Sequence, residues 1–164
     1  MTLPDRIDNE TDLEDALAEP SQADLECVAR LDGEILVLGA GGKMGPSLAR
    51  RVHRAVKRTG RPNRLLAASR FSSPAVRAGL ESEGIATLGC DLLDPERIAA
   101  LPRCPYVLFL AGRKFGTLDR TDLTWATNTV VPARVAEHFH QSRMVVFSTG
   151  NVYPLVPAGS SGSR

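Results

Sequence analysis

The chain contains 164 residues, about the length of one domain, and its 20 Lys and Arg residues nearly balance 19 Asp and Glu residues. This balance excludes a strong electrostatic attraction to nucleic acid or to an anionic membrane surface. The 3 cysteines have no CxxC spacing, so they indicate neither a disulfide framework nor a zinc site, and we expect no bound metal. Reduced thiols of this kind are typical of a cytoplasmic protein.

Residues 1–33 form an acidic leader in which we expect one or two short helices. Thr11 and Ser21 each stand three residues before an acid, Glu14 and Asp24, a pattern typical of a capped helix start. The leader has no basic stretch followed by an apolar run, and no apolar run of the chain reaches the ~18 residues that a membrane helix requires. We therefore expect a soluble cytoplasmic protein, with a leader that packs on the main body and carries no chemistry.

From residue 34 to residue 153, short apolar runs alternate with helical patterns. We expect strands at residues 35–38, 65–68, 85–88, 106–110 and 144–147. Helices lie between them, the longest over about 122–140, with Trp125 and Phe139 in the core. This alternation predicts an α/β fold with a mostly parallel, doubly wound sheet of strand order 3-2-1-4-5. Residues 154–164 are rich in Pro, Gly and Ser and are expected to form a loop.

A glycine-rich turn follows the first expected strand and opens the next helix. Its three glycines at spacings of three, Gly39, Gly42 and Gly45, form a GxxGxxG motif, and Gly41 adds a GxGxxxG spacing. Turns of this composition let the backbone approach a pyrophosphate, which then faces amide groups and the positive end of the helix. We expect the cofactor contacts of this turn at Gly39, Gly41, Gly42, Lys43, Met44 and Gly45. The alternative is a plain strand-to-helix turn; a Walker A loop is excluded, because Lys43 is followed by Met44 instead of Ser or Thr.

The end of the second expected strand should select the cofactor. An acid at this place would bond the 2′-hydroxyl of NAD, but the sequence has Ser69 and Arg70. A serine and an arginine suit a 2′-phosphate, with which the arginine makes a charge-assisted contact. We therefore favour NADP over NAD. The alternative is that Arg70 is a solvated loop charge.

Four further segments appear in a recognisable order: Asp91-Leu92, Leu110-Ala111-Gly112, the Asn128 helix, and the run from Phe147 through Thr149 to Tyr153. Together with the glycine turn, they resemble the N-terminal half of the extended short-chain dehydrogenase/reductases, the NAD-dependent epimerase/dehydratase family. The resemblance covers about residues 34–157 and implies a Rossmann-type dinucleotide-binding domain over residues 34–153.

The resemblance also implies a role for each matching residue. Asp91 and Leu92 would contact the adenine ring, and Ala111 and Gly112 match the small pair over which the cofactor crosses the fourth strand. Lys114 is similar to a lysine that follows this pair in sugar-nucleotide epimerases. Asn128 matches the helix asparagine near the nicotinamide. Thr149 matches the active-site Ser/Thr that bonds the reacting oxygen of the substrate.

Each of these residues also has a purely structural interpretation. Asp91 could cap the next turn, and Ala111 and Gly112 could be small for packing alone. Asn128 could bond a nearby loop, and Thr149 could cap local backbone. We interpret Tyr153 as a packed aromatic residue, and His53, His138 and His140 as surface residues.

The sequence departs from the family at the catalytic tyrosine. The family uses a Tyr-x-x-x-Lys pair, whereas Leu110 stands four residues after Tyr106 and Pro157 four residues after Tyr153. We expect the chain to be a fragment truncated after the fifth strand, inactive alone, with apolar surface exposed where a further helix would pack.

Two functions remain open at this point. In the first, the chain is the NAD(P)-binding part of an epimerase, dehydratase or reductase that acts on a small molecule such as a nucleotide sugar and forms a homodimer at full length. Alternatively, it is a non-catalytic NADP(H)-binding sensor or scaffold module.

Overall fold

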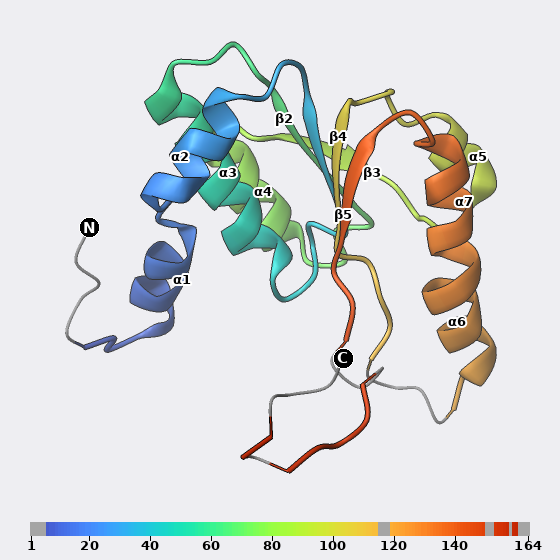
Figure 1. Ribbon diagram of the computed structural model, residues 1–164. Coiled ribbons are helices and arrows are strands. Elements are labelled where there is room, and N and C mark those ends of the chain that lie inside the picture. Colours follow the sequence, from blue (N-terminus) through green and yellow to red (C-terminus); the bar gives the residue numbers. More distant parts are fainter. Residues whose placement is uncertain (1–5, 115–118, 150–152, 158, 161–164) are drawn as a thin grey trace.

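The computed structural model describes residues 6–114, 119–149, 153–157 and 159–160, and its centre is a 5-stranded parallel sheet (Figure 1). The strands are β1 (Ile35–Leu38), β2 (Leu65–Ser69), β3 (Ala86–Gly89), β4 (Tyr106–Phe109) and β5 (Arg143–Val146). They pair in the order β3-β2-β1-β4-β5. The predicted doubly wound sheet and its strand order are therefore confirmed.

Helices cover both faces of this sheet (Figure 1). One face carries α3 (Gly45–Thr59) and α4 (Pro74–Ser82), and α1 (Glu10–Ala18) and α2 (Gln22–Ala29) pack on α3 from outside. The other face carries α5 (Pro95–Ala99), α6 (Thr121–Trp125) and α7 (Val131–His138). Within the described ranges, no helix is both long and apolar enough to cross a membrane.

The long helix predicted over about 122–140 is present but irregular. A π-helical turn, η1 (Ala126–Val130), joins α6 to α7. Pro132 lies at the start of α7 and has no N–H to donate to the regular hydrogen-bond ladder. Because Pro132 cannot donate this hydrogen bond, the helix departs from regular α geometry in the turn just before it, where η1 lies.

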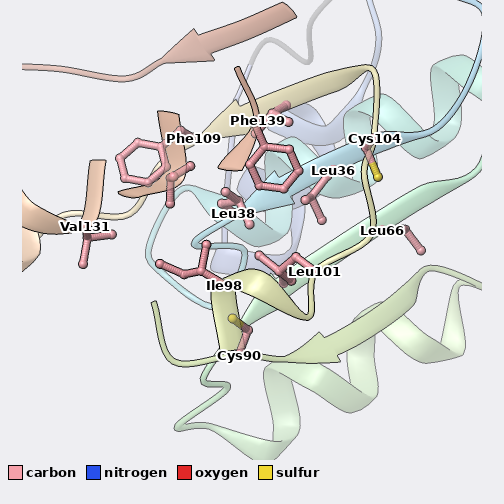
Figure 2. Close-up of a cluster of buried hydrophobic side chains, with 13 residues drawn as sticks. Leu36, Leu38, Leu66, Cys90, Ile98, Leu101, Cys104, Phe109, Val131 and Phe139 are labelled. Atoms are coloured by element: carbon pink, nitrogen blue, oxygen red, sulfur yellow. The ribbon is translucent and has the colours of Figure 1, made fainter. Parts of the chain in front are cut away.

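Each face of the sheet has its own hydrophobic core, because successive strand residues point to opposite sides. Leu36 and Leu38 of β1 pack with residues of α5 and α7 and with Phe139, as Figure 2 shows. Ile35 and Val37 pack on the other face with residues of α2, α3 and α4. All four β1 side chains are buried. This burial fixes the position of β1 and therefore the start of the glycine turn that follows it.

Some apolar residues do not lie where the sequence predicts. Phe139 is 2% exposed, as expected, but Trp125 is 72% exposed and Tyr153 is 58% exposed. The prediction that Trp125 belongs to the core is wrong because α6 and η1 bury none of their side chains. The expected exposure of apolar surface near the fifth strand is observed, since Val145 and Val146 are both more than half exposed.

The histidine predictions are only partly correct. His140 is exposed, but His53 and His138 are half-buried. The His138 ring lies 3.2 Å from the Leu101 carbonyl and packs edge-on against Phe139. These two imidazoles are therefore part of the packed structure and not solvated surface groups.

The described part of the leader, residues 6–33, contains the helices α1 and α2, which pack on one side of α3. Helix α1 is capped by Asn9 and not by Thr11 as predicted, because the Asn9 side chain accepts from the Asp12 amide. Ser21 and Asp24 form the predicted capping box of α2. Four arginines of α3 reach acids of the leader: Arg50 to Glu14 (3.4 Å), Arg51 to Asp24 (2.6 Å), Arg54 to Asp15 (2.7 Å) and Arg58 to Glu19 (2.5 Å).

We expect Asp24→Ala to lower the free energy of unfolding by about 1–2 kcal/mol, because it removes both the α2 cap and the Arg51 pair. Burial raises the pKa of Asp24, but hydrogen bonds from Ser21 and Arg51 outweigh it and hold the pKa below its ordinary value. The carboxylate therefore stabilises the fold above an unfolded pKa of 3.8, and this contribution is lost as the pH falls through the lower folded pKa. Urea unfolding against Glu26→Ala, an exposed residue of the same helix, measures the effect. Equal losses in the two variants would contradict the docking role.

Candidate functional site

The glycine turn lies where β1 ends and α3 begins, at the carboxyl edge of the sheet (Figure 1). Gly39 has a φ of +88°, and a Cβ on it would lie 2.7 Å from the Ala111 amide nitrogen. A Cβ on Gly45 would overlap the Ala40 backbone. Only glycine fits at these two positions, so the backbone of the turn is drawn tightly against the end of β4 and against itself.

The outer part of the turn faces solvent. Gly42, Lys43 and Met44 are exposed, and Gly41 is half-buried. The N-cap residue of α3, Met44, makes no side-chain cap hydrogen bond, and the first turn of this 15-residue helix contains no acid. The positive end of the helix dipole is therefore uncompensated by side chains at an exposed backbone, which favours an anion.

The end of β2 lies directly against this turn. A Cβ on Gly41 would lie 2.7 Å from Ser69 Oγ and 3.3 Å from the Phe71 ring. Ser69 is half-buried and Arg70 is exposed. The two residues predicted to select the cofactor are therefore next to the glycine turn, with Arg70 open to solvent.

Phe71 is a residue of this site that the sequence analysis missed. Its φ is +50°, a conformation that a bulky side chain rarely adopts, and its side chain is only 8% exposed. The Arg77 guanidinium lies 5.8 Å from the Phe71 ring centroid. Phe71 therefore anchors the bend that turns Arg70 outward, and no sequence pattern marks a phenylalanine for this role.

Asp91 and Leu92 follow β3 at the same edge. One carboxylate oxygen of Asp91 accepts from the Leu93 amide at 3.0 Å, which is the local cap considered as its structural alternative. Leu92 packs against the α5–α7 core. Both residues are half-buried, and their contact with an adenine ring stays a prediction.

Asn128 fastens the segment that follows β4. Its Oδ1 accepts from the Arg113 amide at 2.8 Å, and its Nδ2 donates to the Arg113 carbonyl at 2.9 Å. Gly112 lies beside this clamp, because a Cβ on it would be 3.6 Å from Asn128 Oδ1. The loop-bonding interpretation of Asn128 is thus observed, and its approach to a nicotinamide stays a prediction.

The other predicted site residues follow β4 and β5. Ala111 lies against Gly39, as described above, whereas Lys114 and Thr149 are exposed. Gly150, Asn151 and Val152 of the motif after β5 lie outside the described residues. In the sheet order, Ser69 and Thr149 follow strands on opposite sides of the glycine turn. The structure therefore brings Gly39, Gly41, Ser69 and Ala111 together. The contact of Lys114 with the cofactor and that of Thr149 with the substrate stay predictions.

The position of this site within the sheet is typical of ligand sites in doubly wound folds. Among the described residues, no group of at least 3 His, Cys, Asp and Glu side chains could hold a metal ion. The carboxyl edge of a doubly wound sheet, where the crossovers change direction between β1 and β4, is where such folds bind their ligands.

Comparisons with known proteins identify a family and similar solved structures. The NAD dependent epimerase/dehydratase family matches residues 35–163. No curated protein matches the chain. Three solved structures share the fold at 16–22% identity.

The first is ADP-L-glycero-D-manno-heptose-6-epimerase of Helicobacter pylori, with 17% identity, a TM-score of 0.65, and coverage of 85% of this chain and 45% of that chain. The epimerase Mth375 of Methanothermobacter thermautotrophicus has 22% identity, a TM-score of 0.67, and coverage of 82% and 41%. WbmF of Bordetella bronchiseptica in complex with NAD+ has 16% identity, a TM-score of 0.55, and coverage of 79% and 40%. The chain thus spans less than half the length of these proteins.

Proposed function

The chain belongs to the NAD dependent epimerase/dehydratase family, and from this membership we propose that its residues 34–153 form a domain that holds NADP. The chemistry that a nicotinamide cofactor supplies is hydride transfer to or from a carbinol carbon. The observation that carries the proposal is the glycine turn, whose exposed backbone begins a 15-residue helix without an acid in its first turn.

The residues of the turn have different roles in binding the diphosphate. Gly39 and Gly45 let the backbone approach Ala111 and Ala40, and this approach shapes the cradle. Gly41, Lys43 and Met44 present backbone amides to the phosphates, and Lys43 adds a positive charge. The Gly42 amide donates to the Gly39 carbonyl at 3.0 Å, so Gly42 serves the cradle by leaving it free of a side chain. Asp91 and Leu92 contact the adenine. Ala111 and Gly112 are small residues and leave room for the cofactor to cross the end of β4.

The preference for NADP rests on the end of β2. Ser69 Oγ lies against Gly41, so the 2′ substituent of a ribose that follows the diphosphate would lie beside Ser69 and Arg70. The exposed guanidinium of Arg70 and the hydroxyl of Ser69 both donate to a phosphate, whereas neither replaces the acid that NAD requires. NADP is therefore the better fit.

The substrate is proposed to be a nucleotide sugar or a similar small metabolite in the full-length protein. One support is the WbmF structure in complex with NAD+ and UDP. Thr149 would donate to the reacting oxygen of the substrate, and Lys114 and Asn128 would lie toward the nicotinamide. The remaining residues of a longer polypeptide would complete the substrate site, and the full-length protein would be a cytoplasmic homodimer.

A second candidate is a sensor or scaffold that binds NADP(H) without turnover. It is kept as a candidate because, within these 164 residues, neither Tyr106 nor Tyr153 is followed by a lysine at the fourth position. Turnover of nucleotide sugars by the longest natural form of the protein separates the candidates, because binding without any product would support the sensor.

We expect Gly42→Ala to weaken NADP+ binding by at least about tenfold, because its methyl group would stand between the exposed backbone and the phosphates. The fold should tolerate the change, since the new Cβ meets only the Gly39 carbonyl, at 3.3 Å. Isothermal titration measures the affinity, and thermal unfolding verifies the fold.

The matched control for this test is Gly79→Ala on α4. There the new Cβ meets only the flexible end of Arg50, at 3.2 Å, and the site is not part of the glycine turn. Its affinity for NADP+ should equal that of the unmodified chain. Unchanged affinity in Gly42→Ala would refute the cradle and with it the proposed function.

A further inference from the structure

A cavity lies at the opposite edge of the sheet from the glycine turn. Its volume is about 430 Å³, and its wall includes Leu65 and Ala86, at the amino ends of β2 and β3. The last turn of α3 closes it with Val56 and Lys57. The glycine turn and Ser69 lie at the carboxyl ends of β1 and β2, so this cavity is separate from the proposed cofactor site (Figure 1).

The wall of this cavity is positively charged. It includes Lys57, Arg61, Arg64 and His53, and no acidic side chain. Burial, and after it the Lys57 charge, lowers the pKa of His53, so its ring is neutral at neutral pH. A concave surface lined by one sign of charge concentrates ions of the other sign.

The acids near these cations lie outside the wall and leave most of the positive charge available. Glu34 is 3.6 Å from Arg64, and Asp32, which is 96% exposed, is 4.0 Å from Arg61. Among the described residues, Lys57 Nζ donates to the Glu83 main-chain carbonyl at 3.4 Å, while the Glu83 carboxylate pairs with Arg50 at 2.5 Å. Exposed pairs of this length compete weakly with a multiply charged ligand.

Three polar atoms in the same wall are buried without a hydrogen-bond partner among the described residues: Arg61 Nε, His53 Nε2 and Asn63 Oδ1. Asn63 is only 9% exposed, and its Nδ2 donates to the Gly33 carbonyl at 2.6 Å, which fixes the position of its amide. Buried polar atoms without partners are costly and uncommon. Because these three atoms are closed off from solvent, they lie behind the cavity surface, and the contacts available to a ligand come from the exposed ends of the basic side chains.

We propose that this cavity binds a phosphate monoester of a small metabolite. The phosphate would accept from Lys57, Arg61 and Arg64. The volume exceeds that of a phosphate ion, and Val56 and Leu65 provide an apolar wall for the carbon skeleton. The site does not depend on the proposed cofactor function, since it shares no residue with the glycine turn.

The test follows the imidazole NMR signals while inorganic phosphate, ribose 5-phosphate or ribose is added to the whole chain at constant ionic strength and pH. The chain has 3 histidines, and His138 and His140 border a different cavity, so they serve as internal controls. We expect a saturable shift of the His53 signals alone, with ribose 5-phosphate binding more tightly than phosphate and ribose giving no shift.

Alanine variants test whether ribose 5-phosphate binds in this cavity. Lys57→Ala and Arg64→Ala remove exposed cations of the wall and should each weaken ribose 5-phosphate binding by about tenfold. Arg30→Ala, an exposed arginine outside the cavity, and Arg70→Ala at the proposed cofactor site should leave it unchanged. Three outcomes would overturn the proposal: no His53 shift, equal weakening by Arg30→Ala, or loss of the shift in Arg70→Ala, which would place the phosphate at the glycine turn.

Discussion

Replacing Gly39 by alanine should destabilise the chain by roughly 2–5 kcal/mol, the sum of a left-handed backbone cost and a steric overlap. The φ of +88° disfavours any side chain, and the new Cβ would lie 2.7 Å from the Ala111 amide nitrogen and 3.0 Å from the Leu110 carbonyl carbon. Neither neighbour can move freely, because Leu110 N donates to the Leu38 carbonyl at 2.9 Å within the sheet. Thermal unfolding should show a midpoint lower by on the order of 10 °C.

Gly60→Ala separates the two causes. Gly60 ends α3 with a φ of +63°, but a Cβ on it meets nothing within 4 Å, so the variant keeps the backbone cost and lacks the overlap. We expect it to lose only about 1–2 kcal/mol. If Gly39→Ala and Gly60→Ala were equally stable, the close contact between the glycine turn and the end of β4 would not exist as described.

Local sequence patterns predict most of the fold. An apolar run such as residues 35–38 that ends in glycines predicts a buried strand and a tight turn together, and both are present. The strand order followed because right-handed crossovers leave few arrangements of five parallel strands. Ser21 was likewise recognisable as a cap, since its partner Asp24 is only three residues away.

Features that depend on distant contacts were not predictable in this way. Trp125 has the residue type of a core position, but its exposure follows from where α6 runs relative to the sheet. Asn128 clamps Arg113 across 15 residues, and no spacing rule announces that pair. Phe71 adopts a positive φ that its residue type disfavours, and the cavity on the amino side of β2 and β3 combines α3 with the turn at Gly84, which no single motif contains.

The double substitution Ser69→Asp/Arg70→Ala should reverse the proposed preference of the chain for NADP. Removing the Arg70 guanidinium would delete the proposed charge-assisted contact with the 2′-phosphate, worth about 1.5–3 kcal/mol, which corresponds to about a 10- to 150-fold loss of NADP+ affinity. An aspartate at position 69 would repel the 2′-phosphate and accept from the 2′-hydroxyl of NAD+. Because Ser69 Oγ already lies against Gly41, the new carboxylate would occupy the side of the glycine turn at which the ribose is expected.

The single variants separate the contributions, and titration of each with NADP+ and NAD+ measures them. Arg70→Ala should weaken NADP+ alone, whereas Ser69→Asp should weaken NADP+ and strengthen NAD+. Arg103→Ala removes another exposed arginine, which precedes β4 at its amino end, and should change neither affinity. Equal affinities for both cofactors that Arg70→Ala leaves unaltered would show that Arg70 is a solvated charge, and the NADP preference would then have no basis in this sheet edge.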